Sequence, residues 1–174
     1  IPGAGVEVPV WILGSSTFGA QLAAHLGLPY AFASHFAPAD LEAAMRLYRE
    51  TFRPSKYLSE PYAMAGLNVV AADSDAEAQR LFSSLQQMFV NLRTGNPGKL
   101  APPVEGYEET LDWQGKAVLR HALSSSVVGG PEAVREGLAA FANRSGIDEI
   151  IITGSIHDHA ARLRSFEIAA EAAS

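Results

Sequence analysis

Residues 8–34 read VPVWILGSSTFGAQLAAHLGLPYAFAS, and this stretch contains both kinds of segment that recur along the chain. Val8 to Leu13 is a short apolar run rich in strand-forming residues, which predicts a buried strand ending at a Gly-Ser-Ser turn. From Thr17 to Leu26 apolar side chains recur every four residues, which predicts a helix, and Gly27 suits the left-handed residue that often ends one. Tyr30 to Ser34 repeats the strand pattern. The stretch therefore predicts a strand, a helix and a second strand in succession.

The same alternation continues to the C-terminus. Ser74 and Glu77 have the spacing of a capping box at a helix start, whereas three Gly and three Pro between Thr94 and Tyr107 predict a long irregular excursion. The other predicted elements are a helix from Pro38 to Phe52, a strand from Leu67 to Ala72, a helix to Leu92, helices from Leu111 to Leu123 and from Pro131 to Phe141, a strand from Glu149 to Thr153 and a helix from Asp158 to Ala172. Buried strands alternating with helices predict an α/β protein with a four-stranded parallel sheet.

Four parallel strands with outer helices fit two architectures. One is half of a (β/α)8 barrel of the TIM type, and the other is a small doubly wound parallel sheet. Periodicity does not choose between them, because both use buried parallel strands. The sequence has no internal repeat and no domain boundary.

Composition narrows the classes of partner. The 174 residues are 48% hydrophobic and 18% charged, which is typical of one ordered domain. A net charge of −6 without a basic cluster speaks against nucleic acid and anionic membranes, and no apolar run is long enough to cross a bilayer. Because the chain has no cysteine, it has no disulfide, no Cys-ligated zinc and no thiol catalysis, and we expect a cytoplasmic location. It begins at Ile1 on a loop-like Pro-Gly-Ala-Gly segment without an initiator methionine, so we expect a cut piece or one part of a larger protein.

The Gly-Ser-Ser-Thr turn at residues 14–17 has the chemistry of a phosphate site. Small residues let the backbone approach a ligand, while the free amides and the dipole of a helix start favour an anion. The hydroxyls of Ser15, Ser16 and Thr17 are further donors. The alternative is that Ser15 or Ser16 only caps the helix, and the local sequence alone favours this reading because the turn has neither a Walker lysine nor a complete GxGxxG.

Five segments in succession span nearly all of the sequence: PVWILGSSTFGAQLAAHLGLPYAFASHFAP, LYRETFRPS, NVVAADSDAEA, SVVGGPEAVREGL and DEIIITGSIHDHAARLRSFEIAAE. In their sequence, order and spacing, they resemble the second half of bacterial luciferase-like flavin-dependent monooxygenases. The resemblance implies a (β/α)8 barrel in which the four predicted strands are strands five to eight. Residues 1–174 are then the C-terminal half of a single barrel domain.

The resemblance also implies where the cofactor binds. The FMN phosphate is expected against Gly14, Ser15 and Ser16, with Thr17 as a neighbour at the helix start and with backbone amides as the main contacts. The flavin ring is expected against the end of the next strand, at residues Ala33, Ser34 and His35. Both segments belong to the C-terminal face of the barrel, where ligands bind in this fold.

The function implied is oxygenation of an organic small molecule by reduced FMN and O2, with the reduced flavin supplied by a separate reductase. A non-catalytic flavin-binding barrel protein and a deazaflavin-dependent dehydrogenase are the alternatives. The family's active site also uses strands one to four, so no catalytic residue is assigned within this chain. Because half a barrel leaves two sheet edges unpaired, we expect a homo-oligomer or pairing with the missing N-terminal half.

Two segments with histidine are candidates for a chemical role. For His35 at a strand end, packing is favoured over proton transfer. His157 and His159 flank Asp158 at a helix start, but residues two apart do not share a helical face and Asp158 is explained as a cap. We therefore predict no metal site.

Overall fold

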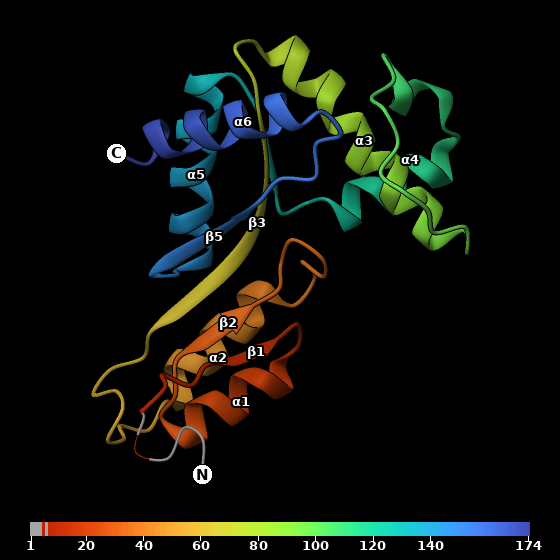
Figure 1. Cartoon of the computed structure of the whole chain (residues 1–174). Coiled ribbons are helices and arrows are strands. Elements are labelled where there is room, and N and C mark those ends of the chain that lie inside the picture. Colours follow the sequence, from red (N-terminus) through yellow and green to blue (C-terminus); the bar gives the residue numbers. More distant parts are fainter. Residues whose placement is uncertain (1–4, 6) are drawn as a thin grey trace.

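The computed structural model describes residues 5 and 7–174, so most of the loop-like segment that begins at Ile1 lies outside the described residues. Strands and helices alternate along most of the chain (Figure 1). The elements are β1 (Ile12–Gly14), α1 (Thr17–Leu26), β2 (Tyr30–Phe32), α2 (Leu41–Thr51), β3 (Ala63–Ala71), α3 (Asp75–Arg93), the 3-10 helix η1 (Tyr107–Thr110), α4 (Trp113–Ala122), β4 (Ser126–Gly129), α5 (Pro131–Ser145), β5 (Glu149–Thr153) and α6 (His159–Ala172). Within these described residues, no helix has both the length and the apolar character that crossing a membrane requires.

The sheet is singly wound, as in a barrel. β1, β2, β3 and β5 are parallel neighbours in chain order, with Tyr30 opposite Ala63 and Gly66 opposite Ile151. A doubly wound sheet reverses its strand order at a switch point, and the sheet that the described residues form has no such reversal. The doubly wound alternative is therefore wrong, and the half-barrel prediction is confirmed.

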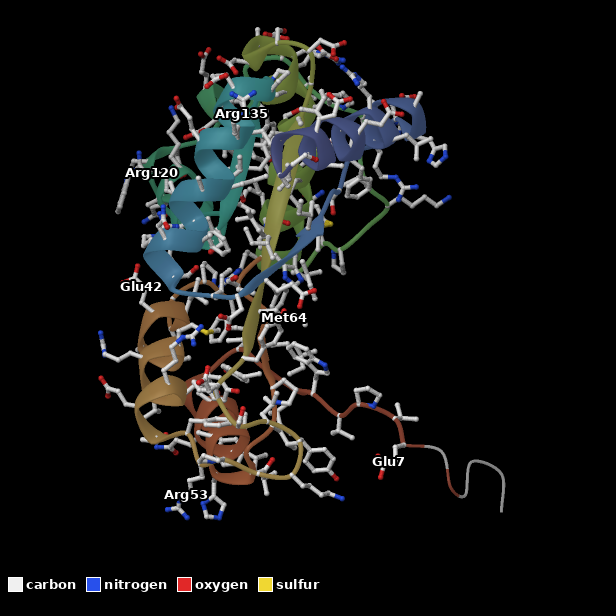
Figure 2. The ribbon with its side chains drawn as sticks, turned by 90° about the vertical axis from the view of Figure 1, so that its left-hand side faces the viewer. Glu7, Glu42, Arg53, Met64, Arg120 and Arg135 are labelled. Carbon is white, nitrogen blue, oxygen red and sulfur yellow. The ribbon has the colours of Figure 1, made fainter. Side chains whose placement is uncertain are left out.

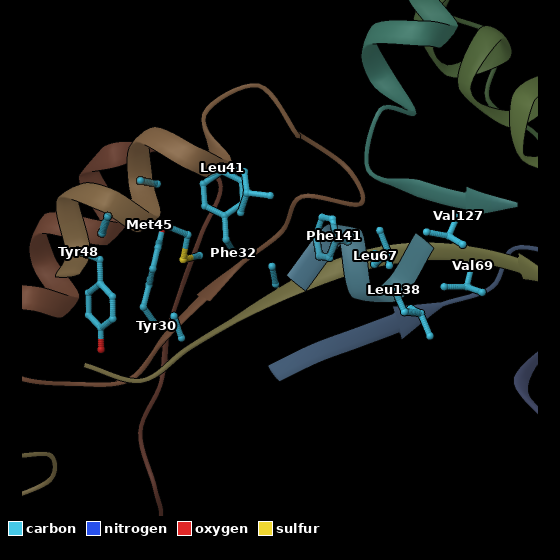
Figure 3. Packing of buried hydrophobic residues seen from close by; sticks show 14 of the residues in the cluster. Tyr30, Phe32, Leu41, Met45, Tyr48, Leu67, Val69, Val127, Leu138 and Phe141 are labelled. Carbon is cyan, nitrogen blue, oxygen red and sulfur yellow. The ribbon is translucent and has the colours of Figure 1, made fainter. Parts of the chain in front are cut away.

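The two faces of β3 differ in what covers them. Side chains alternate between faces along a strand, and the odd-numbered residues from Ala63 to Ala71 are buried against α1, α2, α5 and α6. Figure 3 shows this core, which continues along the strand from Tyr48 of α2 to Leu138 of α5. The even-numbered residues Met64, Gly66 and Asn68 point to the opposite face, called the inner face from here on.

The inner face also includes the residues paired with these in register. Ala31 and Leu13 share a row with Met64, while Ile151 pairs with Gly66. Leu13 and Ile151, on the two outermost strands, are 72% and 47% exposed. The inner face thus carries apolar side chains without neighbours, as expected for one half of a barrel.

β3 is much longer than its neighbours. It has nine residues, against three in β1 and β2, and Figure 2 shows it passing through Met64 from the α1–α2 unit to the helices beyond. Its first part pairs with β2 and β5, and its last part, Asn68 to Ala71, pairs with β4. The amide of Tyr30 donates to the carbonyl of Tyr62, and the amide of Asn68 donates to the carbonyl of Ser125. Both hydrogen bonds use peptide groups of even-numbered residues, Tyr62 and Asn68, and these groups point to the same edge of the strand. β4 therefore pairs with the edge of β3 that also pairs with β2.

The predicted count of four strands is wrong, because β4 makes a fifth. The run SSSVVGGP has only two β-branched residues between serines and glycines, so its local pattern is that of a loop, and only pairing with β3 makes it a strand. β3 also begins at Ala63 rather than Leu67, since Ala and Gly have low strand propensity and extend the strand only through tertiary pairing. β1 begins at Ile12 rather than Val8.

Helix boundaries mostly follow the predicted signals. Gly27 ends α1 with φ of 62°, and Asp158 caps α6 by accepting from the amide of Ala161 at 2.8 Å. At α3 only half of the capping box forms: Ser74 accepts from the amide of Glu77, but the Glu77 carboxylate binds Arg80. The excursion after α3 is irregular as predicted up to η1.

Candidate functional site

The turn from β1 into α1 leaves a helix start open to solvent. Ser15, Ser16 and Thr17 are exposed, and Ser16 occupies the N-cap position in an extended conformation. Its side chain accepts no hydrogen bond from the helix, and the first turn of α1 carries no acidic residue. The capping alternative is therefore wrong for Ser16, and the first amides of α1 keep their capacity to bind an anion.

A buried tyrosine supports this turn from below. Tyr30 is fully buried, and its hydroxyl donates to the carbonyl oxygen of Ser16 at 3.0 Å. Gly14 and Gly19 leave room for it, since a Cβ on either would lie 3.3 Å from the Tyr30 side chain. Burial raises the pKa of Tyr30 to about 12, so the phenol remains a neutral donor. The turn is thus held in place without use of its own hydroxyl groups.

The end of β2 lies directly beside this turn. The amide of Ala33 donates to the carbonyl of Gly14 at 2.9 Å. Ser34 is fully buried, and its hydroxyl donates to the carbonyl of Gly66. Of the predicted wall, Ala33 is therefore half-buried next to the helix start, whereas the Ser34 side chain is already used to hold β2 against β3.

His35 lies over the inner face of β3. A Cβ at Gly66 would overlap the imidazole Nδ1, so the ring occupies space that only a glycine leaves free. Nδ1 is buried and has no hydrogen-bond partner. Desolvation by burial lowers the pKa of His35 below its ordinary value of 6.5, which favours the neutral ring at pH 7. The histidine is packed as predicted, with one ring nitrogen unsatisfied.

Asn68 joins three strands at this point and was not among the predicted site residues. It is 4% exposed; its Nδ2 donates to the carbonyl of His35 at 2.8 Å, and its Oδ1 accepts from the Thr153 hydroxyl at 2.9 Å. An asparagine inside the apolar run LNVVA was the available signal, because a buried amide needs partners. Asn68 fixes the turn after β2 relative to the end of β5.

Small residues lie on the inner face of these strands. Ala31 and Gly66 face inward on β2 and β3, and the His35 ring packs in the space that Gly66 leaves. The predicted residues of both segments, apart from the buried Ser34, thus lie next to one another, with Gly66 beneath the His35 ring, and we call this set the cofactor face: Gly14 to Thr17, Ala33, His35 and Gly66.

The His-Asp-His segment takes no part in this surface. Asp158 caps α6, and His159 Nδ1 lies 2.9 Å from the guanidinium of Arg162. Across the described part of the chain, no three His, Cys, Asp or Glu side chains gather in a way that would hold a metal ion.

Comparison with known proteins decides the family. The family model described as luciferase-like monooxygenase matches residues 1–149. The chain belongs to the luciferase-like monooxygenase family. A relative from Escherichia coli (strain K12), itself named luciferase-like monooxygenase, is 50% identical over 169 residues, which cover 97% of this chain and 50% of that protein. The protein YvbT of Bacillus subtilis (strain 168) is 48% identical over 171 residues, covering 98% of this chain and 51% of its own length.

Solved structures extend the comparison to the fold. The crystal structure of apo-MsnO8 matches with a TM-score of 0.76 at 31% identity, over 97% of this chain and 52% of that one. The long-chain alkane monooxygenase LadA shares the fold alone, with a TM-score of 0.61 at 16% identity over 94% of this chain and 40% of LadA. The chain therefore spans about half the length of the luciferase-like relatives that it matches.

Proposed function

We propose that this chain carries the cofactor-binding half of a monooxygenase that uses reduced FMN and O2 on an organic small molecule. The observation that carries the proposal is the hydrogen bond between Ala33 and Gly14, which sets an uncapped helix start beside a wall of small inner-face side chains. FMN has a phosphate and a flat ring joined by a short chain, and the cofactor face offers a complement to each.

The phosphate would be held by backbone amides at the start of α1. The helix is ten residues long, so its dipole is fully developed, and no carboxylate competes in its first turn. The hydroxyls of Ser15, Ser16 and Thr17 are exposed on the same turn and add donors. The start of α5 differs from the start of α1, because its Gly130 amide already donates to the Asp75 carboxylate, at 2.6 Å.

The ring would lie against Ala33 and His35. When bound, reduced flavin supplies the chemistry that activates O2, and the protein binds, orients and excludes water. Gly66 makes room for the His35 ring, and the neutral ring would offer a nitrogen to a hydrogen-bonding edge of the flavin. We assign no proton transfer to any residue of this chain.

We further propose that residues 1–174 are the C-terminal half of one barrel domain. Leu13 and Ile151 on the outermost strands then pack against strands of an N-terminal half. The intact mass of the purified protein tests this: about twice the mass expected for 174 residues supports the proposal. A mass equal to that of 174 residues, with pairs of copies in solution, would contradict it.

Cofactor and activity are tested on the intact protein. FMN and a deazaflavin are titrated by fluorescence, and O2 uptake is then measured with NADH, a flavin reductase and a panel of organic substrates. FMN binding with substrate-dependent O2 uptake supports the proposal. FMN binding without such uptake identifies a non-catalytic flavoprotein, and deazaflavin binding with hydride transfer identifies a dehydrogenase. Binding of neither cofactor overturns the proposal.

A further inference from the structure

The helices α3 and α4 form a cap beside the cofactor face. Beyond the ends of β2 and β5, the strand β3 continues to Ala71; α3 packs against this part of the strand, where Val70 faces inward, and α4 packs on α3. α5 packs on the other face, where Gly137 lies against Val127. The cap therefore covers the same side of the sheet as the cofactor face, displaced toward the C-terminal ends of the strands.

Two contacts connect the cap to the cofactor face. Ser126 of β4 is the register partner of Asn68, whose amide holds the His35 carbonyl. Phe36, which follows His35, packs against Phe89 of α3 with ring centroids 6.5 Å apart. The cap thus adjoins the turn that carries His35.

A cavity of about 360 Å³ lies inside the cap, between α3, α4 and β4. This volume is within the range of small-molecule sites. Apolar side chains from all three elements line it: Phe82, Leu119, Leu123 and Val128.

The cavity also contains polar atoms that lack good partners. The Oγ of Ser126 is buried without a hydrogen-bond partner, and Gln86 is 7% exposed with only a long contact of 3.4 Å to Glu108. A buried hydroxyl without a partner is uncommon, because its desolvation is not compensated. Glu108 and Arg120 bring one charge of each sign to the lining, so the cavity has no net preference for an ion.

We propose that this cavity is the substrate site of the monooxygenase, and that it takes a neutral molecule with an apolar body and one carbonyl-type acceptor for the Ser126 hydroxyl. The proposal rests on the proposed function, because the cofactor face must hold the flavin next to it. Phe82, Leu119 and Leu123 contact the apolar body. Ser126 fixes the polar end on the side of Asn68, toward the flavin.

The test uses 2-decanone as the probe and undecane as a matched hydrocarbon without an acceptor. Binding to the intact protein is measured by calorimetry and, with FMN loaded, by the absorbance of the flavin. Wild type is expected to bind 2-decanone more tightly than undecane and to shift the flavin absorbance. Ser126→Ala should weaken 2-decanone roughly three- to tenfold, the loss of one hydrogen bond, and leave undecane unchanged. Ser126→Leu should weaken binding of both, because the larger side chain occupies part of the cavity and removes the donor.

Ser124→Ala is the control, since Ser124 is exposed two residues away on the same segment. It should change neither affinity. Failure of wild type to bind 2-decanone, equal affinity for 2-decanone in wild type and Ser126→Ala, or binding that leaves the flavin absorbance unchanged would each overturn the inference. The FMN titration is independent of the probe, so loss of FMN binding would instead overturn the proposed function.

Discussion

The amide of Ala33 donates a hydrogen bond to the carbonyl of Gly14, so the end of β2 and the start of α1 form one continuous surface. Neither segment alone distinguishes a cofactor site from ordinary packing. Together they place an open helix terminus, small inward side chains and a packed histidine next to one another at the ends of β1 and β2.

Replacing Ser16 with Asp should separate helix stability from cofactor binding. An aspartate at this N-cap position accepts a helix amide and favours the dipole, so the free energy of unfolding without cofactor should rise by about 0.5–1 kcal/mol. The same charge repels a phosphate, and FMN should bind at least about tenfold more weakly while riboflavin is little affected. Urea unfolding and fluorescence titration measure the two effects.

Ser74→Asp is the matched control, because Ser74 is the N-cap of α3 and already accepts an amide there. It should leave FMN affinity unchanged. Equal FMN binding by wild type and Ser16→Asp would show that the phosphate does not lie at this turn.

Gly66→Ala should displace His35. The added Cβ overlaps the imidazole Nδ1, so the ring must move, at a cost of about 1–3 kcal/mol in unfolding free energy and with weaker FMN binding. Gly98→Ala is the control, since a Cβ there meets no atom within 4 Å. Thermal unfolding and FMN titration of both variants check this, and an unaltered Gly66→Ala protein would contradict the placement of His35.

Asn68→Leu should break the link between β2 and β5. The variant leaves the carbonyl of His35 and the hydroxyl of Thr153 without their partner, and should destabilise the protein by about 1–3 kcal/mol. Thr153→Val removes only one of these bonds and should cost less. A double-mutant cycle tests the link: additive losses would mean that the two residues do not act through one another.

Stability should depend on the charge of His35. Burial lowers its pKa in the folded state below the 6.5 of the ordinary side chain, so the unfolded chain binds the proton more readily. Stability is then complete above about pH 6.5 and falls as the pH decreases through that value. Urea unfolding at several pH values should show a smaller fall for His35→Asn than for wild type. Identical pH profiles would contradict a desolvated imidazole.

The helices and the buried strands could be predicted because their signals are local. Gly27 and Asp158 end and begin helices as their residue types indicate, and the apolar run at β5 is correct to the residue. Local patterns could not separate a half-barrel from a doubly wound sheet, because strand order depends on contacts between distant segments. β4 was missed for the same reason, since SVVG is a strand only because Asn68 to Ala71 lies beside it.

The candidate site was predicted in part. Gly14 to Thr17 and His35, which were chosen from the sequence, lie close together, whereas the Ser34 hydroxyl donates to the carbonyl of Gly66. Asn68 and Gly66 could not be selected from spacing, because their importance depends on the register of β3 against its neighbours. Ser126 could not be selected either, because it belongs to β4, the strand that the sequence pattern did not predict.

The segment from Asp75 to Gly129 leaves β3 and returns to it at nearly the same point. The amide of Ala72 donates to the carbonyl of Gly129 at 3.2 Å, so the two ends of a stretch that includes α3, η1, α4 and β4 lie next to each other. A segment with adjacent ends can be exchanged or lengthened without moving the strands that hold the cofactor face. The helices of this segment can therefore change during evolution while β1, β2, β3 and β5 keep their arrangement.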